Sequence, residues 1–339
     1  MNTQFAAELV QERIPGVSIV KLDALENAGG FSGAKIWKVE TDVGSFCVRR
    51  WPKPHPSKER LSFIHEVLFH LEYHGFQLVA APRRSQTGDS WTEYDAHFWE
   101  VTTWLPGKSD FWLDASEIRL RNAMSSLGRF HAISKKQTAW RRLARSPGIS
   151  HRIQRLREIE PTWTQRLMRA IETEALSGFQ SDSASRIRSL CQLIATKSSQ
   201  LADPCLGGLI RFDTQHELSP CLRDIWHDHV LFREDQVTGI IDYGALNIDV
   251  PAGDFARLLG SLALDDARFW EIGCDAIQQA LPEMRVQIPL IKAIDFANVV
   301  LAGLNWINWL FIEKREFPIH SNVIARLDHI HRRLAGRFE

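Results

Sequence analysis

The first hundred positions carry short runs in which apolar and polar residues alternate, the pattern of half-buried strands. Glycine, proline and aspartate turns bound these runs, which predict strands at 17–22, 34–41, 45–50, 91–94 and 96–105. An amphipathic helix is expected at the amino-terminal end. A second helix begins at Ser57, where apolar residues recur at three and four positions, and ends near Gly75. The chain therefore opens with a small antiparallel sheet and two helices.

After Pro106-Gly107 the apolar residues follow the helical period. This predicts helices at 114–134, 150–174, 184–201, 252–263, 266–281 and 287–313. The exception is a predicted hairpin, in which the β-like runs 230–232 and 239–241 flank the polar turn 233–236. We expect an α+β fold with a small β-rich lobe over 1–105 and a larger α-helical lobe over 106–339. A cleft between two lobes is a common place for a ligand.

Charge narrows the classes of function. The chain has 339 residues, and 41 lysines and arginines balance 41 aspartates and glutamates. A balanced chain has no broad positive field, so general nucleic-acid binding is not expected. The basic segment 135–157 has two interpretations, a solvated helical surface or a patch for an anionic substrate or partner.

Cysteine usage and hydropathy bear on the compartment. The five cysteines lie far apart without a C-x-x-C pair, so neither a disulfide framework nor a zinc knuckle is expected. The amino-terminal residues lack the pattern of a signal peptide. The uncharged run 296–312 contains three asparagines and is too short for a membrane span. We expect a cytoplasmic protein without a membrane partner.

Two carboxylates mark the candidate chemistry. Asp224 precedes the predicted hairpin, and Asp242 closes its second strand in Ile-Asp-Tyr-Gly. Carboxylates at the two ends of a tight hairpin can converge, one to hold a metal and the other to orient or accept a proton. Turn residues that cap a hairpin have the same appearance, so the motifs around the pair decide between the two interpretations.

Those motifs resemble the aminoglycoside phosphotransferase family, which includes choline-kinase-like and homoserine-kinase-like enzymes on a protein-kinase-like fold. The family pattern is H-G-D-x-x-x-x-N-V-L, a hairpin, I-D-x-G and then D-x-A. This chain has L-R-D-I-W-H-D-H-V-L, I-D-Y-G and Asp254-Phe255-Ala256. The resemblance implies that Asp224 is catalytic and that Asp242, with His229, binds Mg²⁺ or Mn²⁺.

The resemblance extends to the first lobe and implies ATP or GTP as phosphoryl donor. Gly30 and Ser32 lie in a glycine-rich turn like the one over the nucleotide phosphates, and Arg49 stands where the phosphate-pairing cation belongs. Glu66 resembles the helix glutamate that anchors this cation. Thr103 and Leu105 lie at the hinge, which ends in W-L-P-G. The motifs appear in family order between residues 20 and 310.

The chain departs from the family at two places. His229 replaces the asparagine that binds the second metal, and imidazole is a poorer Mg²⁺ ligand than an amide oxygen. The neighbouring Asp228 is an alternative ligand. Leu222-Arg223 replaces the H-G pair before Asp224. The prediction is a phosphotransferase that acts on a hydroxyl of a small molecule, and a nucleotide-binding pseudokinase or scaffold without turnover is the alternative. The sequence does not indicate the oligomeric state.

Overall fold

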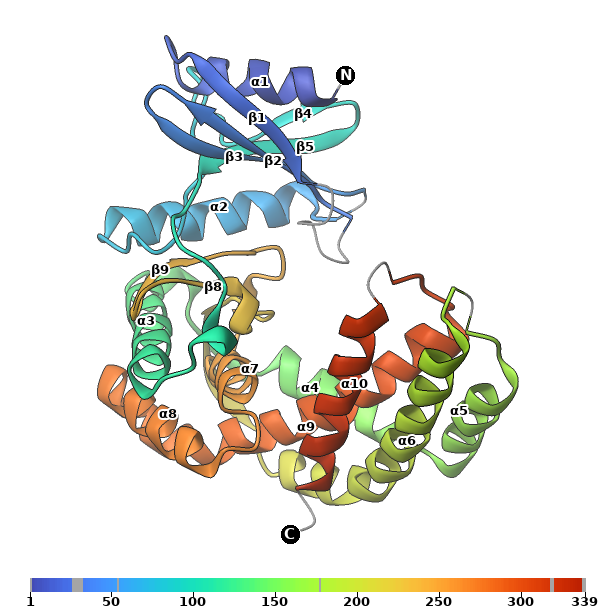
Figure 1. Cartoon of the computed structure of the whole chain (residues 1–339). Coiled ribbons are helices and arrows are strands. Elements are labelled where there is room, and N and C mark those ends of the chain that lie inside the picture. Colours follow the sequence, from blue (N-terminus) through green and yellow to red (C-terminus); the bar gives the residue numbers. More distant parts are fainter. Residues whose placement is uncertain (1, 26–32, 54, 177, 318–319, 337–339) are drawn as a thin grey trace. The chain divides into compact units, whose positions relative to one another are not determined.

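The computed structural model describes residues 2–25, 33–53, 55–176, 178–317 and 320–336 (Figure 1). By its contacts the chain forms two compact units. Unit 1 comprises residues 1–139 and 222–247, and unit 2 comprises residues 140–221 and 248–339. These contact units are not the predicted lobes, because residues 106–139 and the hairpin at 222–247 group with the sheet. The predicted boundary at 105/106 remains a prediction.

Unit 1 contains a five-stranded antiparallel sheet in the order β1-β2-β3-β5-β4. Its strands are β1 (Ile19–Leu25), β2 (Lys35–Thr41), β3 (Gly44–Arg50), β4 (Thr92–Tyr94) and β5 (His97–Thr103). Its helices are α1 (Asn2–Arg13), α2 (Lys58–Tyr73), η2 (Phe111–Leu113), α3 (Glu117–Ser134) and η3 (Thr138–Trp140), the last of which ends at the unit boundary. The five strands predicted from alternation are confirmed.

Alternation along the strands assigns the two faces of this sheet. Trp37 of β2, Val48 of β3, and Trp99 and Val101 of β5 are buried in one core with the apolar residues of α1. Their neighbours along each strand point to the opposite face, where α2 lies (Figure 1). Arg49 belongs to this second face. The core on one side thus fixes which side chains face α2.

Local signals explain the limits of α2. The hydroxyl of Ser57 accepts a hydrogen bond from the backbone N–H of Arg60 and caps the first turn. Gly75 has a φ of +76°, the left-handed conformation that ends many helices. The predicted limits of this helix, Ser57 and Gly75, are confirmed.

The rest of unit 1 is a hairpin made of β8 (Val230–Arg233) and β9 (Gln236–Ile240), preceded by η4 (His227–His229). The hairpin was predicted from its polar turn and is confirmed. It pairs with the segment after β5, because Lys108 and Phe232 exchange backbone hydrogen bonds of 2.9 and 2.8 Å. These two hydrogen bonds thus connect the hinge segment after β5 to the hairpin, although the two are distant in sequence.

Unit 2 is mainly helical. Its helices are α4 (Pro147–Arg157), α5 (Pro161–Thr173), α6 (Ser181–Ile210), α7 (Ala252–Ala263), α8 (Ala267–Ala280), η5 (Pro282–Gln287), α9 (Ile288–Ile307), η6 (Asn308–Ile312) and α10 (His320–Ala335). Helix α6 packs against α4, α5, α9 and α10. A three-stranded sheet in the order β10-β7-β6 adjoins these helices, with β6 (Arg142–Arg145), β7 (Gln215–Cys221) and β10 (Asn247–Asp249) at the unit boundary.

Two expectations for unit 2 were wrong or incomplete, and two of its features were not predicted. The helix predicted over 150–174 is two helices, because Pro161 occupies the first turn of a new one. Helix α6 runs past the predicted end at 201 and continues through Pro204. The small sheet and α10 were not predicted.

The apolar run that ends at Ile312 lies in a core helix. Among the described residues, one helical stretch, Pro282–Ile312, is long and apolar enough to cross a membrane by length and composition. Of its most apolar window, 67% is buried within the protein. Asp295 in this stretch forms a buried ion pair with Arg333 of α10, with 2.7 Å between nitrogen and oxygen. The prediction of a buried helix is confirmed.

Candidate active site

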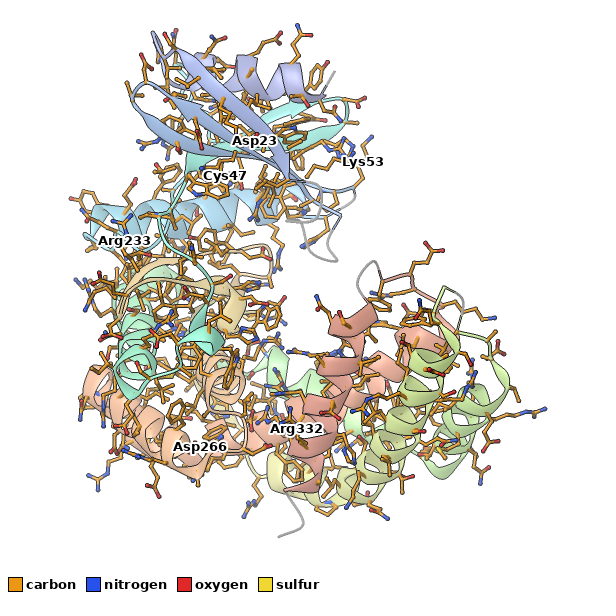
Figure 2. All side chains as sticks on the ribbon, viewed as in Figure 1. Asp23, Cys47, Lys53, Arg233, Asp266 and Arg332 are labelled. Carbon is orange, nitrogen blue, oxygen red and sulfur yellow. The ribbon has the colours of Figure 1, made fainter. Side chains whose placement is uncertain are left out.

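Arg49 lies on the α2-facing side of β3, two residues after Cys47, which Figure 2 labels. Its Nε is 3.8 Å from Oε1 of Glu100, and its Nη1 is 3.5 Å from Oδ1 of Asp242. The guanidinium also lies over the ring of Trp51, 4.8 Å from its centroid. Burial disfavours the charged form, but neighbouring acidic groups, Asp242 and Glu100 first among them, raise the pKa of Arg49. The structure thus holds the Arg49 guanidinium between two carboxylates and an aromatic ring.

The expected pairing of Arg49 with Glu66 is wrong. Glu66 is exposed on α2 and makes no ion pair with any of the described residues. The neighbouring His65 faces inward instead, and its Nε2 lies 2.7 Å from Oε2 of Glu100. Because the helical period turns successive residues by about 100°, a shift of one position exchanges an inward side chain for an outward one. Glu100 of β5 is the carboxylate that the sequence analysis missed.

Glu100 is held ionised by its surroundings. Burial would favour the neutral acid, but the hydrogen bond from His65, the charge of His65 and the charge of Arg49 lower the pKa of Glu100. One signal could have found this residue, because Arg49 and Glu100 are direct partners in the register of β3 and β5. That signal requires knowing that these two strands pair.

Asp242 follows β9 and has a φ of +64°, a conformation that non-glycine residues rarely adopt. The surrounding loop is tied to the structure on both sides. Ile240 donates its N–H to Leu78 O at 2.7 Å, and Arg60 donates to Ala245 O at 2.8 Å. The buried Tyr243 accepts a hydrogen bond from the N–H of Ala80 at 3.3 Å. A strained backbone kept in place by its neighbours is common at functional sites.

The carboxylate of Asp242 fits a divalent cation. Its side chain is 45% exposed, and hard cations such as Mg²⁺ prefer carboxylate oxygen. Its Oδ2 lies 3.7 Å from Nε2 of His229, so Asp242 lies near both His229 and Arg49. Of these three residues, Asp242 is the one that offers carboxylate oxygen, the ligand that the implied Mg²⁺ or Mn²⁺ would prefer.

His229 fits that metal less well. The indole N–H of Trp226 donates a hydrogen bond to Nε2 of His229 at 2.9 Å. An imidazole nitrogen that accepts a hydrogen bond has its lone pair engaged, and in the neutral ring the proton then sits on the other nitrogen. As a ligand through Nε2, His229 would have to give up this hydrogen bond. The sequence analysis did not single out Trp226, whose indole N–H occupies Nε2 of His229.

Asp224 lies on an exposed loop between β7 and η4. Arg223 before it has a φ of +65°, so both predicted catalytic loops contain a left-handed non-glycine residue. Asp228, the alternative metal ligand, has Oδ1 at 3.0 Å from Nδ1 of His227. The role of Asp224 remains a prediction, which its exposed position after a strained residue supports.

The hinge residues form the end of β5 and the segment after it. The Thr103 hydroxyl accepts a hydrogen bond from Arg83 at 2.8 Å. Leu105 lies against Gly239, where an added Cβ would come within 3.0 Å of the leucine side chain. Gly107 has a φ of +105°, and a Cβ there would lie 2.7 Å from the carbonyl oxygen of Phe232. Small residues on both sides thus let this segment lie close to the hairpin. Gly30 and Ser32 lie outside the described residues.

Part of the basic segment 135–157 has polar or acidic partners within unit 2. Arg141 lies 2.9 Å from Glu217, and Arg145 lies 3.4 Å from Asp213. Arg152 donates a hydrogen bond of 2.8 Å to Asn298. These partners favour the interpretation as a solvated surface over an anion-binding patch.

Comparisons with known proteins give the family and the fold of this chain. Residues 23–286 match the model of the phosphotransferase enzyme family. The fold is similar to a spectinomycin phosphotransferase solved with ADP and spectinomycin, at a TM-score of 0.64 and 13% identity, covering 99% of this chain and 94% of that one. An aminoglycoside phosphotransferase from Alicyclobacillus acidocaldarius gives 0.61 and 14%, covering 94% and 91%.

A third solved structure extends the likeness beyond aminoglycosides. A macrolide 2'-phosphotransferase from Brachybacterium faecium gives a TM-score of 0.52 and 15% identity, covering 96% of this chain and 97% of that one. A comparison with curated proteins gives no match. The predicted α+β, protein-kinase-like fold is confirmed, with 56% of the chain helical and 17% in strands.

Proposed function

Because the chain belongs to the phosphotransferase enzyme family, we propose that it transfers a phosphoryl group from ATP or GTP to a hydroxyl of a small molecule. The observation that carries this proposal is the meeting of Arg49 and Asp242 within 3.5 Å. One is a partly buried cation on a sheet, and the other is a carboxylate on a strained loop. Phosphoryl transfer requires mainly positioning and charge stabilisation, which such a pair supplies.

Each residue has a distinct role in the proposed reaction. Arg49 pairs with phosphate oxygens of the nucleotide, for which a guanidinium is well suited. Asp224 orients the acceptor hydroxyl and receives its proton. Thr103 and Leu105 at the hinge contact the nucleotide base in this proposal, and Gly30 and Ser32, which lie outside the described residues, bind its phosphates.

The proposed cofactor is Mg²⁺ or Mn²⁺, which neutralises charge on the phosphate oxygens when bound. Asp242 is the residue that would hold it. The hydrogen bond from Trp226 to Nε2 of His229 argues that His229 contributes little as a second ligand in this arrangement. Asp228 lies one residue before His229 and offers oxygen, the harder donor.

The acceptor is assigned only as a small molecule with a hydroxyl. The similar structures act on spectinomycin and macrolides by name, and their identity to this chain is at most 15%. We further propose a cytoplasmic protein without nucleic-acid or membrane partners, on the ground of its balanced charge and its buried apolar helix.

A thermal-shift titration tests the proposal. The full chain is titrated with ATP and with GTP, each with and without Mg²⁺ or Mn²⁺. A ligand that binds only the folded state at a hundred times its Kd stabilises it by about 2.7 kcal/mol. We expect a metal-dependent rise in the melting temperature, and no rise with either nucleotide at millimolar concentration would contradict the proposal.

Matched variants make this test specific. Asp242→Asn should abolish the metal-dependent part of the shift while the protein remains folded. Asp95→Asn is the control, because Asp95 is an exposed aspartate that also has a positive φ, of +51°, in the β4–β5 turn. If both variants respond to metal and nucleotide as the wild type does, Asp242 is a structural turn residue. Screening amino-alcohols, sugars and aminoglycosides as acceptors then identifies the substrate.

The same site also supports a second candidate, a nucleotide-binding protein without turnover. The observation that favours it is the imidazole of His229 at the family asparagine, with its Nε2 engaged by Trp226. His229→Asn restores the family residue, and Trp226→Phe removes the indole donor. If the protein is an enzyme, His229→Asn should change the background rate of ATP hydrolysis. If it is a nucleotide-binding protein alone, neither variant should alter that rate.

A further inference from the structure

Glu100 stands at the centre of a buried polar chain that links three elements of unit 1. It lies in the middle of β5, directly opposite Arg49 of β3 in the strand register. One carboxylate oxygen, Oε1, is 3.8 Å from Arg49, and the other, Oε2, is 2.7 Å from His65 of α2. Only 9% of its side chain is exposed. A buried carboxylate in this position must be paired, because an unpaired one would be strongly destabilising.

His65 holds the second oxygen of Glu100 and is itself held. It is 1% exposed, and its Nδ1 lies 2.8 Å from the hydroxyl of Ser90. An ionised carboxylate only accepts hydrogen bonds, so Nε2 of His65 donates to Glu100. Both ring nitrogens are therefore engaged, and the ring has a single orientation between α2 and β5.

We infer that Glu100, held by His65, is the positioning residue for Arg49 in the proposed phosphoryl transfer. The inference rests on the proposed function. It assigns the anchoring of Arg49 to Glu100 of β5, whereas the sequence analysis assigned this role to Glu66 of α2. A strand carboxylate is fixed by the backbone hydrogen bonds of its sheet, so the pair with Arg49 needs no glutamate from the helix. Helix α2 contacts Glu100 through His65.

The charges around Arg49 explain why Glu100 should affect the binding of nucleotide and metal. Among the described residues, Arg49 has Glu100 and Asp242 as carboxylate partners. When Asp242 binds a metal, its charge is shared with the cation, and Glu100 is the remaining carboxylate that holds the guanidinium. Without Glu100, Arg49 would be drawn to Asp242 and would compete with the metal. Loss of the Glu100 charge should therefore weaken nucleotide binding and also raise the metal concentration that binding requires.

Calorimetric titration of the full chain with ADP, over a series of Mg²⁺ concentrations, tests this inference. Glu100→Gln should weaken nucleotide binding about tenfold and shift the Mg²⁺ midpoint upward. The control is Glu72→Gln, which removes an exposed carboxylate elsewhere on α2 and should bind as the wild type does. Glu66→Gln tests the competing carboxylate on α2.

A double-mutant cycle separates positioning from a structural role. In an Arg49→Met background, Glu100→Gln should cause no further loss of affinity, because its effect passes through the guanidinium. An equal loss in both backgrounds would overturn the inference, as would a loss in Glu66→Gln without one in Glu100→Gln. If Glu100→Gln does not fold, His65→Asn keeps the carboxylate and should give a smaller loss that also disappears without Arg49. A wild-type chain that binds no nucleotide would overturn the proposed function, and with it this inference.

Discussion

Replacing Gly107 with alanine should destabilise unit 1 more than a glycine substitution usually does. Gly107 has a φ of +105°, so alanine would be strained there whatever the space, at about 1–3 kcal/mol. An added Cβ would also lie 2.7 Å from the carbonyl oxygen of Phe232, and a backbone atom cannot rotate away. Such overpacking costs about 1–3 kcal/mol more. We expect a total loss of about 4 kcal/mol.

The chain offers a matched control in Gly88. It has a similar φ of +93° with nothing within 4 Å of an added Cβ, so Gly88→Ala contains the strain without the contact. For a domain of roughly 150–250 residues, 1 kcal/mol corresponds to about 2–4 °C in melting temperature. Gly107→Ala should therefore melt about 8–16 °C below the wild type and Gly88→Ala about 4–8 °C below it. Equal losses in scanning calorimetry would refute the argument from close packing.

Three further predictions concern the site and the core. Asp224→Asn should retain nucleotide binding and lower turnover by about 10² to 10⁴, the range for removal of a positioned proton acceptor, and equal turnover in a coupled assay would contradict its role. Since His65 and Arg49 lower the pKa of Glu100 in the folded state, its contribution to stability is present above the ordinary glutamate pKa and is lost as pH falls through the lower folded value. Glu100→Gln should therefore flatten the acid side of the stability profile below about pH 4.5, as measured by denaturant unfolding. Asp295→Ala removes one partner of a buried ion pair and should destabilise unit 2 by about 3–5 kcal/mol; a loss near zero in urea unfolding would show that the pair is solvated.

The sequence predicted elements well where a local pattern decides the structure. The strands of unit 1 alternate between a core face and a polar face, and helix α2 begins at a serine cap and ends at a glycine. The short strands β6 and β7 show no such alternation. In β6 (Arg142–Arg145) no residue is buried, and in β7 (Gln215–Cys221) the buried residues are the last four. Their pairing depends on contacts between residues about seventy positions apart.

The candidate site shows the same limit. Arg49, His229 and Asp242 were predicted from motifs in the chain, and the structure brings these three together. The carboxylate that pairs with Arg49 was predicted on the wrong element, because the choice between Glu66 and Glu100 depends on helix phase and on which strands pair. Neither quantity can be measured from the spacing of a motif alone.

The discontinuity of the two units has a consequence for how the protein is made. Unit 1 needs residues 222–247 to complete its hairpin, and unit 2 needs the residues from 248 onward. The segments of the two units therefore alternate along the chain. A ribosome adds roughly 5–20 residues per second, which leaves on the order of ten seconds between the emergence of Ala139 and that of Asn247. During this interval the sheet of unit 1 has its core but lacks the strand that pairs with Lys108. The nascent chain therefore carries an incomplete unit 1 throughout the synthesis of residues 140–221.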